Sequence, residues 1–245
     1  MNISFEGKRI LVTGAGQGIG KGICLRLSEY KGTVIALSNN KDNLAKLSQE
    51  YPNIRTVCVN LLDWDATREA VKNVLPIDLL VNNAGIGSHG SWLKVTSTDF
   101  DDTFGVNVKA MFNVSQVVAQ NMIERNVKSG AIVNLSSQAG VSVLKDCTVY
   151  CSTKAAVNML TMSLAQDLGP HNIRVNCVQP TVVMAGMGKI FITDCKEAED
   201  MKNRIPLGRF AEVEDVVDAV VYLLSDRSSM ITGAGLPVDG GYLTA

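Results

Sequence analysis

Tyr150 and Lys154 stand four residues apart in the stretch SSQAGVSVLKDCTVYCSTK, which covers residues 136–154. If this stretch is helical from about Val149 onward, both side chains project from one face of the helix. An ammonium group beside a phenol favours the phenolate, so it lowers the pKa of the tyrosine and suits the hydroxyl to proton transfer near neutral pH. Ser137 follows a predicted strand, and a short loop can fold its hydroxyl back onto the phenol. The pair alone is not diagnostic, because a solvated lysine beside a half-buried tyrosine has the same spacing.

A glycine-rich turn follows the first predicted strand. The strand KRILVTG leads into GAGQGIGKG, and a helical pattern comes next. In this geometry backbone N–H groups and a helix N-terminus can bind phosphate. A P-loop is excluded, because Ala15 and Gly22 stand where that motif needs Gly and Ser or Thr. The alternative is a glycine-rich turn without a ligand. The pattern present is T-G-x-x-x-G-x-G, formed by Thr13, Gly14, Gly18 and Gly20.

Continuous apolar runs alternate with amphipathic helical patterns along the chain, which predicts a doubly wound parallel α/β sheet with helices on both faces. Four of these runs end in polar or glycine-rich residues, namely TGAG, SNN, NNAG and LSSQ. Ligands bind at the carboxyl ends of the strands in such sheets. We therefore expect one domain, residues 1–245, of about seven strands. The predicted strands cover residues 8–14, 33–38, 54–64, 77–85, 131–137, 173–180 and part of 232–245.

The end of the second predicted strand bears on the choice of nicotinamide cofactor. A carboxylate at this position binds a free ribose 2′-OH, whereas basic or neutral polar groups accept a 2′-phosphate. The residues present are Ser38, Asn39, Asn40 and Lys41, all able to hydrogen-bond a phosphate. NADP(H) is therefore favoured over NAD(H).

Two later stretches are candidates for functional roles. A long helical pattern runs from Thr98 to Glu124 and contains Asn107, which either satisfies a kink in the backbone or takes part in catalysis. A less regular segment of about thirty residues follows the sixth strand, and such long excursions are usually functional or disordered. Its apolar residues can close over a ligand; they are Met184, Met187, Ile190, Phe191 and Ile192.

Composition narrows the possible classes of protein. The net charge is −1, which provides no electrostatic reason to expect nucleic acid or an anionic membrane as partner. No apolar run reaches the ~18 residues of a membrane span, and the start of the chain lacks the pattern of a signal peptide, so a cytoplasmic protein is expected. The six cysteines have no CxxC spacing and there are only two histidines, so a zinc site is not expected.

Taken together, these motifs resemble those of the short-chain dehydrogenase/reductase family over nearly the whole chain. They are TGAGQGIG, NNAG at 82–85, Asn107, Ser137 and YCSTK at 150–154. Within the family, VYCSTKAAVNMLT, IRVNCVQPTVVM and NRIPLGRFAEVEDVVDAVVYLLSDRSSM are most similar to the dicarbonyl/L-xylulose reductases. The resemblance implies a Rossmann fold, a nicotinamide cofactor and a homotetramer with the C-terminal strand and the Tyr150-bearing helix at its interfaces.

The resemblance also implies roles for individual residues. Tyr150 would donate the proton, Ser137 would hydrogen-bond the carbonyl oxygen, Lys154 would lower the Tyr150 pKa and bind the ribose, and Asn107 would hold a water linked to Lys154. The implied cofactor-binding residues are Gly14, Gln17, Gly18, Ile19, Gly20, Ser38, Asn39, Asn60, Leu61, Asn83, Ala84, Gly85, Tyr150, Lys154 and Val183. The candidate substrate-binding residues are Ser137, Gln138, Leu144, Cys147, Tyr150, Met187 and Phe191.

The sequence departs from the family pattern at several of these positions. Members usually carry basic residues at Gln17 and Asn39, which weakens the inference to NADP(H). Asn60 replaces an Asp at the adenine edge, Ala185 replaces a Thr, Pro180-Thr181 replaces Pro-Gly, and Cys147 replaces a His of vertebrate-like members. Gln138 can donate to and accept from a second oxygen beside the reacting carbonyl, which suits an α-dicarbonyl or a ketose.

The expected function is therefore NADP(H)-dependent reduction of small α-dicarbonyls and ketoses such as L-xylulose, a reaction of carbohydrate metabolism. Alternatives are an NAD(P)-dependent dehydrogenase of a polyol, steroid or β-ketoacyl substrate, and a nucleotide-binding scaffold without turnover. The scaffold would have a broken Asn-Ser-Tyr-Lys set, whereas all four residues are present. A hydrolase is disfavoured because the chain has no G-x-S-x-G motif.

Overall fold

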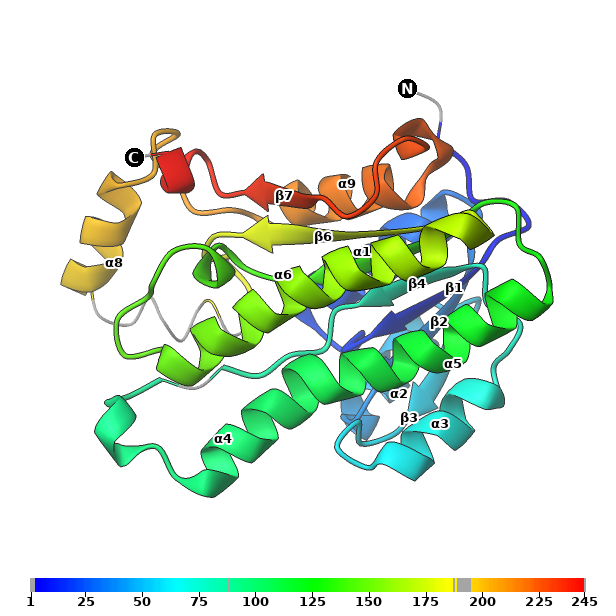
Figure 1. Cartoon of the computed structure of the whole chain (residues 1–245), viewed down its shortest axis with the longest axis horizontal. Helices are drawn as coiled ribbons and strands as arrows, with labels where there is room; N and C mark the ends of the chain where they lie inside the picture. Colours follow the sequence, from blue (N-terminus) through cyan, green and yellow to red (C-terminus); the bar gives the residue numbers. More distant parts are fainter. Residues whose placement is uncertain (1–2, 88, 187, 189–194, 245) are drawn as a thin grey trace.

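Seven strands form one parallel sheet in the computed structural model of the chain, which describes residues 3–87, 89–186, 188 and 195–244. Their order is β3-β2-β1-β4-β5-β6-β7, and Figure 1 shows the strands with their carboxyl ends at one edge of the molecule. This confirms the predicted doubly wound sheet. The strands are β1 Arg9–Thr13, β2 Thr33–Ser38, β3 Arg55–Cys58, β4 Leu79–Asn82, β5 Gly130–Leu135, β6 Ile173–Pro180 and β7 Gly235–Val238.

Helices cover both faces of the sheet (Figure 1). α1, α2 and α9 contribute to the hydrophobic cluster on one face, whereas α3, α5 and α6 contribute to the cluster on the other. The α-helices are α1 Gly18–Glu29, α2 Lys41–Glu50, α3 Trp64–Lys72, α4 Ser97–Phe104, α5 Ala110–Glu124, α6 Thr148–Leu168, α8 Cys195–Asn203 and α9 Val213–Leu224.

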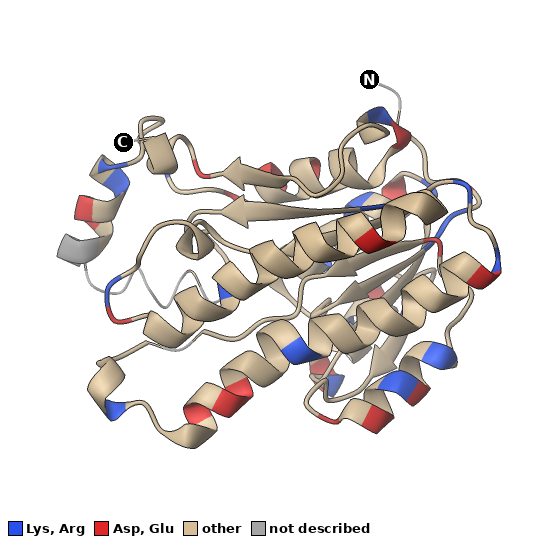
Figure 2. Ribbon diagram, in the orientation of Figure 1, with Lys and Arg blue, Asp and Glu red and all other residues tan. Residues whose placement is uncertain are grey.

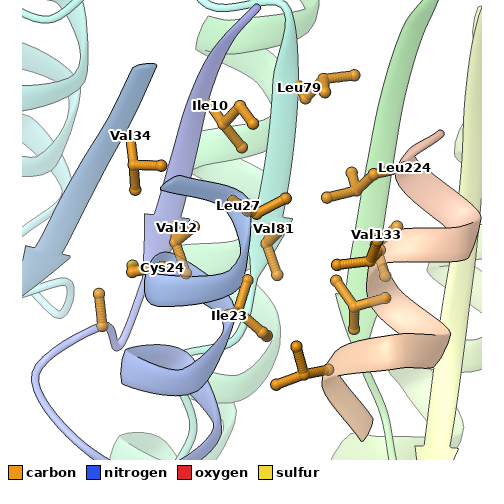
Figure 3. Packing of buried hydrophobic residues seen from close by; sticks show 14 of the residues in the cluster. Ile10, Val12, Ile23, Cys24, Leu27, Val34, Leu79, Val81, Val133 and Leu224 are labelled. Carbon is orange, nitrogen blue, oxygen red and sulfur yellow. The ribbon is translucent and has the colours of Figure 1, made fainter. Parts of the chain in front are cut away.

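Alternate residues of the strands point into the two clusters. Ile10 and Val12 pack on the α1 side, where Figure 3 shows them beside Ile23 and Leu27 of α1, while Leu11 packs on the other side. All five side chains are fully buried. Burial on both faces explains why the strands read as continuous apolar runs instead of alternating ones.

The third strand is shorter than predicted. The sequence pattern suggested a strand over 54–64, but β3 ends at Cys58 and Trp64 already belongs to α3. Between them Asp63 caps α3, since its Oδ1 accepts a hydrogen bond from Ala66 N at 2.9 Å. The Asp63 cap satisfies a backbone N–H at the start of α3 and so stabilises a helix there. The chain therefore begins a helix at Trp64, although the apolar run predicted a strand.

The long helical run expected over 98–124 is present but not uniform. α4 and α5 are joined by a π-helical turn at Gly105–Lys109, and Asn107 lies within this turn. Among the described residues between 181 and 209, those of α8 form a regular helix. Met187, Ile190, Phe191 and Ile192 lie outside the described residues, so their expected place over a ligand stays a prediction.

Charged side chains of both signs are interspersed along the outer helices, as Figure 2 shows. In the described part of the chain, no helix is long and apolar enough to span a membrane. No group of three or more His, Cys, Asp or Glu side chains there is arranged to hold a metal ion.

Candidate active site

A cavity of about 780 Å³ opens at the carboxyl ends of the strands. It lies where the chain order reverses, because β1 has β2 on one side and β4 on the other, and this crevice is the usual ligand site of doubly wound sheets. All fifteen residues predicted to bind the cofactor line it, as do Ser137, Gln138, Leu144 and Cys147. Met187 and Phe191 lie outside the described residues, and Asn107 stands behind the wall of the cavity.

The glycine-rich turn leaves room for a phosphate at the start of α1. Gln17 precedes the helix in an extended conformation and its side chain makes no capping hydrogen bond, and the first turn of α1 has no acidic residue. Gly14 has a positive φ of 64°, and a Cβ there would lie 2.7 Å from Ala84 Cα. A Cβ at Gly20 would lie 2.3 Å from Gly14 O. The turn therefore requires glycine, and the first N–H groups of α1, which have no partner within a helix, fit the pyrophosphate of a dinucleotide.

The opposite end of this turn forms a neutral polar subsite. Ser38, Asn39 and Asn43 line it together with Gln17, and no carboxylate of the described residues lines the cavity at this end. Asn40 also lines it, but its side-chain oxygen caps α2 by accepting from Asn43 N at 2.9 Å. Lys41 does not line the cavity, so the phosphate contact expected of it is not supported by the structure.

α6 carries Tyr150 and Lys154 on one face, as the spacing predicted. Lys154 Nζ lies 5.5 Å from the centroid of the Tyr150 ring and donates a hydrogen bond to Leu135 O at 2.8 Å. Lys154 is only 4% exposed, and burial lowers the pKa of its ammonium to about 8. Removing a charge from water disfavours the charged form.

The pKa of Tyr150 is raised in this structure, not lowered as the Tyr-Lys spacing alone suggested. Burial of the phenol raises the pKa of Tyr150 to about 12, and the hydrogen bond with Ser137 opposes this rise only in part. Burial outweighs the neighbouring groups because it disfavours the phenolate directly. Tyr150 is therefore a protonated donor at neutral pH.

Asn107 lies within the π-helical turn and beside Lys154. Its Oδ1 accepts from Ile86 N at 2.8 Å, while its Nδ2 donates to Ile86 O at 2.9 Å and to Thr153 Oγ1 at 3.0 Å. A Cβ at Gly85 would lie 3.3 Å from Asn107 Oδ1 and 3.6 Å from Lys154 Nζ, so these two groups converge on one point. The side-chain bonds of Asn107 to described residues run to Ile86 and Thr153 and not to the backbone of its own turn, so they do not support the kink interpretation, and its role in catalysis stays a prediction.

The turn that bears Gln138 presents an unpartnered amide. Gln138 is 1% exposed and lines the cavity, yet neither its Oε1 nor its Nε2 has a hydrogen-bond partner among the described residues. Such groups are normally satisfied in native structures. Burial raises the pKa of the Cys147 thiol, which also lines the cavity, to about 11, so this thiol is uncharged at neutral pH.

Asn158, which the sequence motifs did not single out, holds this turn against α6. Its Oδ1 accepts from Ser136 Oγ at 2.7 Å and from Gln179 Nε2 at 3.2 Å, and its Nδ2 donates to Gly140 O at 3.1 Å. These bonds connect α6 to the residues on both sides of Ser137 and Gln138. The sequence signal that could have indicated Asn158 is its position four residues after Lys154, which places both side chains on the same face of the helix.

Comparisons with known proteins agree with this architecture. The family model described as enoyl-(acyl carrier protein) reductase matches residues 14–243. L-xylulose reductase of Mus musculus is 52% identical over 99% of both chains, and carbonyl reductase [NADPH] 2 of Sus scrofa is 47% identical over 100% of both. A solved structure of a putative NAD(P)-dependent gluconate 5-dehydrogenase from Beutenbergia cavernae with bound NADP has a TM-score of 0.94 at 28% identity, and it covers 100% of both chains.

Proposed function

Because this chain belongs to the short-chain dehydrogenase/reductase family, we propose that it is an NADP(H)-dependent reductase of small α-dicarbonyls and ketoses such as L-xylulose. The observation that carries the proposal is the buried, unpartnered amide of Gln138 one residue from Ser137. An amide in this place can bind a second oxygen next to the carbonyl that is reduced. The names of the two curated relatives support the same kind of reaction.

The proposed roles follow from the protonation states and contacts of the site. A nicotinamide cofactor, held by the glycine-rich turn and Lys154, would supply the hydride that the carbonyl carbon accepts. Tyr150, protonated because its pKa lies at about 12, donates its proton to the carbonyl oxygen. Ser137, hydrogen-bonded to Tyr150, stabilises the developing charge on that oxygen. Lys154 stabilises the resulting phenolate, and Asn107 holds the backbone of Ile86 next to this lysine.

The remaining wall of the cavity favours small substrates. Leu144 and Cys147 line it with Gln138, and the high pKa of the thiol keeps Cys147 neutral. We assign Met187 and Phe191 to the same pocket from the resemblance alone. A diketone matches one amide and an apolar wall better than a fully hydroxylated sugar does.

We assign NADP(H) as the preferred cofactor from the neutral end of the cavity. Ser38, Asn39 and Asn43 offer hydrogen bonds, and no carboxylate of the described residues lines the cavity there to contact a 2′-phosphate. The NADP bound to the solved bacterial structure and the NADPH in the name of the Sus scrofa relative agree with this preference.

We further propose that one domain of residues 1–245 carries both sites and assembles as a cytoplasmic homotetramer through α6 and β7. Met159 and Met162 of α6 are 61% and 53% exposed, and β7 is an edge strand of the sheet. Exposed apolar side chains and open strand edges are features that association covers. Size-exclusion chromatography with light scattering tests this directly, and a monomeric mass would contradict it.

An initial-rate panel tests the proposed reaction. Diacetyl, L-xylulose and a β-ketoacyl thioester are each assayed with NADPH and with NADH. We expect turnover of diacetyl and L-xylulose with NADPH. Failure of both with either cofactor would refute the proposal, and turnover of the thioester alone would support the β-ketoacyl alternative.

A further inference from the structure

Thr181 presents a second unpartnered polar group to the same cavity. It directly follows β6, is 7% exposed and lines the cavity, yet its Oγ1 has no hydrogen-bond partner among the described residues. Its backbone is well fixed, because Thr181 N donates to Val238 O at 3.1 Å. The hydroxyl is therefore held in place but left without a partner of its own.

Thr181 and Gln138 lie close to the same contact between β5 and β6. Ser137 Oγ lies 3.5 Å from Pro180 O, and Ser136 N donates to Val178 O at 3.0 Å. Gln138 follows Ser137 in the chain, and Thr181 follows Pro180. Gln138 thus stands one residue from the serine that is proposed to hold the reacting carbonyl, and Thr181 stands one residue from the proline whose carbonyl oxygen lies 3.5 Å from that serine's hydroxyl.

The described residues have four buried side-chain polar atoms without a partner, and three of them belong to Gln138 and Thr181. Buried hydroxyl and amide groups without partners are unfavourable in a folded protein. When such groups line a cavity, a bound molecule with matching donors and acceptors removes the penalty. The proposed function places the reacting oxygen at Ser137, next to this contact between the ends of β5 and β6.

We propose that Thr181 is a specificity-determining residue whose hydroxyl binds the oxygen on the carbon next to the reacting carbonyl. A threonine hydroxyl donates to a carbonyl oxygen and accepts from a hydroxyl. Together with Gln138 it selects vicinally oxygenated ketones, both α-dicarbonyls and α-hydroxyketones, over simple ketones. This inference rests on the proposed function and narrows its substrate class.

Three four-carbon ketones test the inference, because they differ only at the neighbouring carbon. Diacetyl carries a carbonyl there, acetoin a hydroxyl and 2-butanone neither. Thr181→Val removes the hydroxyl at nearly constant volume, and Thr181→Ser retains it. The full-length enzyme and both variants are assayed with saturating NADPH, and the dissociation constant of NADPH is measured by fluorescence titration.

In Thr181→Val we expect kcat/KM for diacetyl and for acetoin to fall about tenfold relative to 2-butanone, the effect of one neutral hydrogen bond. Thr181→Ser should keep the wild-type ratios to within about twofold. Thr103→Val is a matched control, since it removes a hydroxyl of a residue only 2% exposed that bonds Asp99 O within α4. This control should leave the ratios unchanged.

Unchanged ratios in Thr181→Val would overturn the inference while the proposed function stands. A weaker NADPH affinity with an equal loss for all three ketones would overturn it as well, because the hydroxyl would then serve the cofactor's carboxamide. If Thr181→Val does not fold, Thr181→Ser decides. Ratios of kcat/KM, taken relative to 2-butanone, that differ from the wild-type ratios in Thr181→Ser would overturn the inference, and unchanged ratios would support it. A wild-type enzyme inactive on every ketone would overturn the proposed function and this inference together.

Discussion

Replacing Lys154 with methionine should change the pH dependence of stability in a calculable way. Burial lowers the pKa of this ammonium from 10.5 to about 8. Between these values the unfolded chain binds more protons than the native state, so the stability of the wild type rises with pH. The penalty from the buried charge is fully present well below pH 8 and disappears as the pH approaches 10.5.

The size of this effect follows from the same two values. At 1.36 kcal/mol for each pH unit between 10.5 and about 8, the penalty is about 3 kcal/mol at pH 7. It falls to about 1.4 kcal/mol at pH 9.5, a change of about 2 kcal/mol. Lys154→Met removes the penalty but also the 2.8 Å hydrogen bond to Leu135 O. Leaving that carbonyl unpaired costs about 1–3 kcal/mol and does not depend on pH.

Urea unfolding of both proteins at one protein concentration, at pH 7 and at pH 9.5, measures this effect. At pH 7 the stability of Lys154→Met should equal or exceed that of the wild type, although the variant should lose turnover. At pH 9.5 the wild type should gain about 2 kcal/mol relative to the variant. Lys145→Met is the control, because Lys145 lines the same cavity but is exposed. If the difference in free energy of unfolding between wild type and Lys154→Met is the same at both pH values, the account of the buried ammonium is refuted.

Three further substitutions test individual parts of the site. Tyr150→Phe should lose nearly all turnover while its NADPH affinity, measured by fluorescence, stays near that of the wild type; retained turnover would remove the phenol from the mechanism. Asn39→Arg should raise the preference for NADPH over NADH roughly tenfold through a charge-assisted bond to the 2′-phosphate, and an unchanged ratio of kcat/KM would show that Asn39 does not face it. Asn158→Leu should raise KM for diacetyl severalfold more than the dissociation constant of NADPH, since it releases the turn of Gln138. Asn113→Leu, which breaks bonds between α3 and α5 instead, is its control, and equal effects of the two variants on KM would contradict a positioning role for Asn158.

The positions of the site residues could be predicted from the sequence because they depend on local patterns. Polar residues at strand ends meet at one edge of a parallel sheet, so the Gly14 turn, Asn83 and Ser137 were expected to line one cavity, and they do. The bond network of Asn158 was not predictable in this way. An asparagine on a helix has no distinctive spacing, and its partners come from strands that only the folded sheet brings together.

The protonation states of Tyr150 and Lys154 could not be predicted from the sequence for a related reason. The spacing of Tyr150 and Lys154 indicates that the two side chains are neighbours, but not how deeply the sheet and α6 bury them. In the structure, burial raises the pKa of Tyr150 to about 12 and lowers that of Lys154 to about 8, so both shifts favour the neutral forms. A neighbouring charge alone would have shifted the tyrosine in the other direction.

These opposite shifts bear on how the site can reduce a carbonyl. Reduction needs a phenol that keeps its proton until charge develops on the substrate oxygen, and the pKa of Tyr150 ensures this at neutral pH. Phenolate then forms beside Lys154, whose ammonium is held by Leu135 O and lies over the ring. The ammonium is unfavourable while the phenol is neutral and becomes favourable once the proton has left. Burying Lys154 therefore lowers the stability of the resting protein but stabilises the charged state that follows proton transfer, which is the differential stabilisation that catalysis requires.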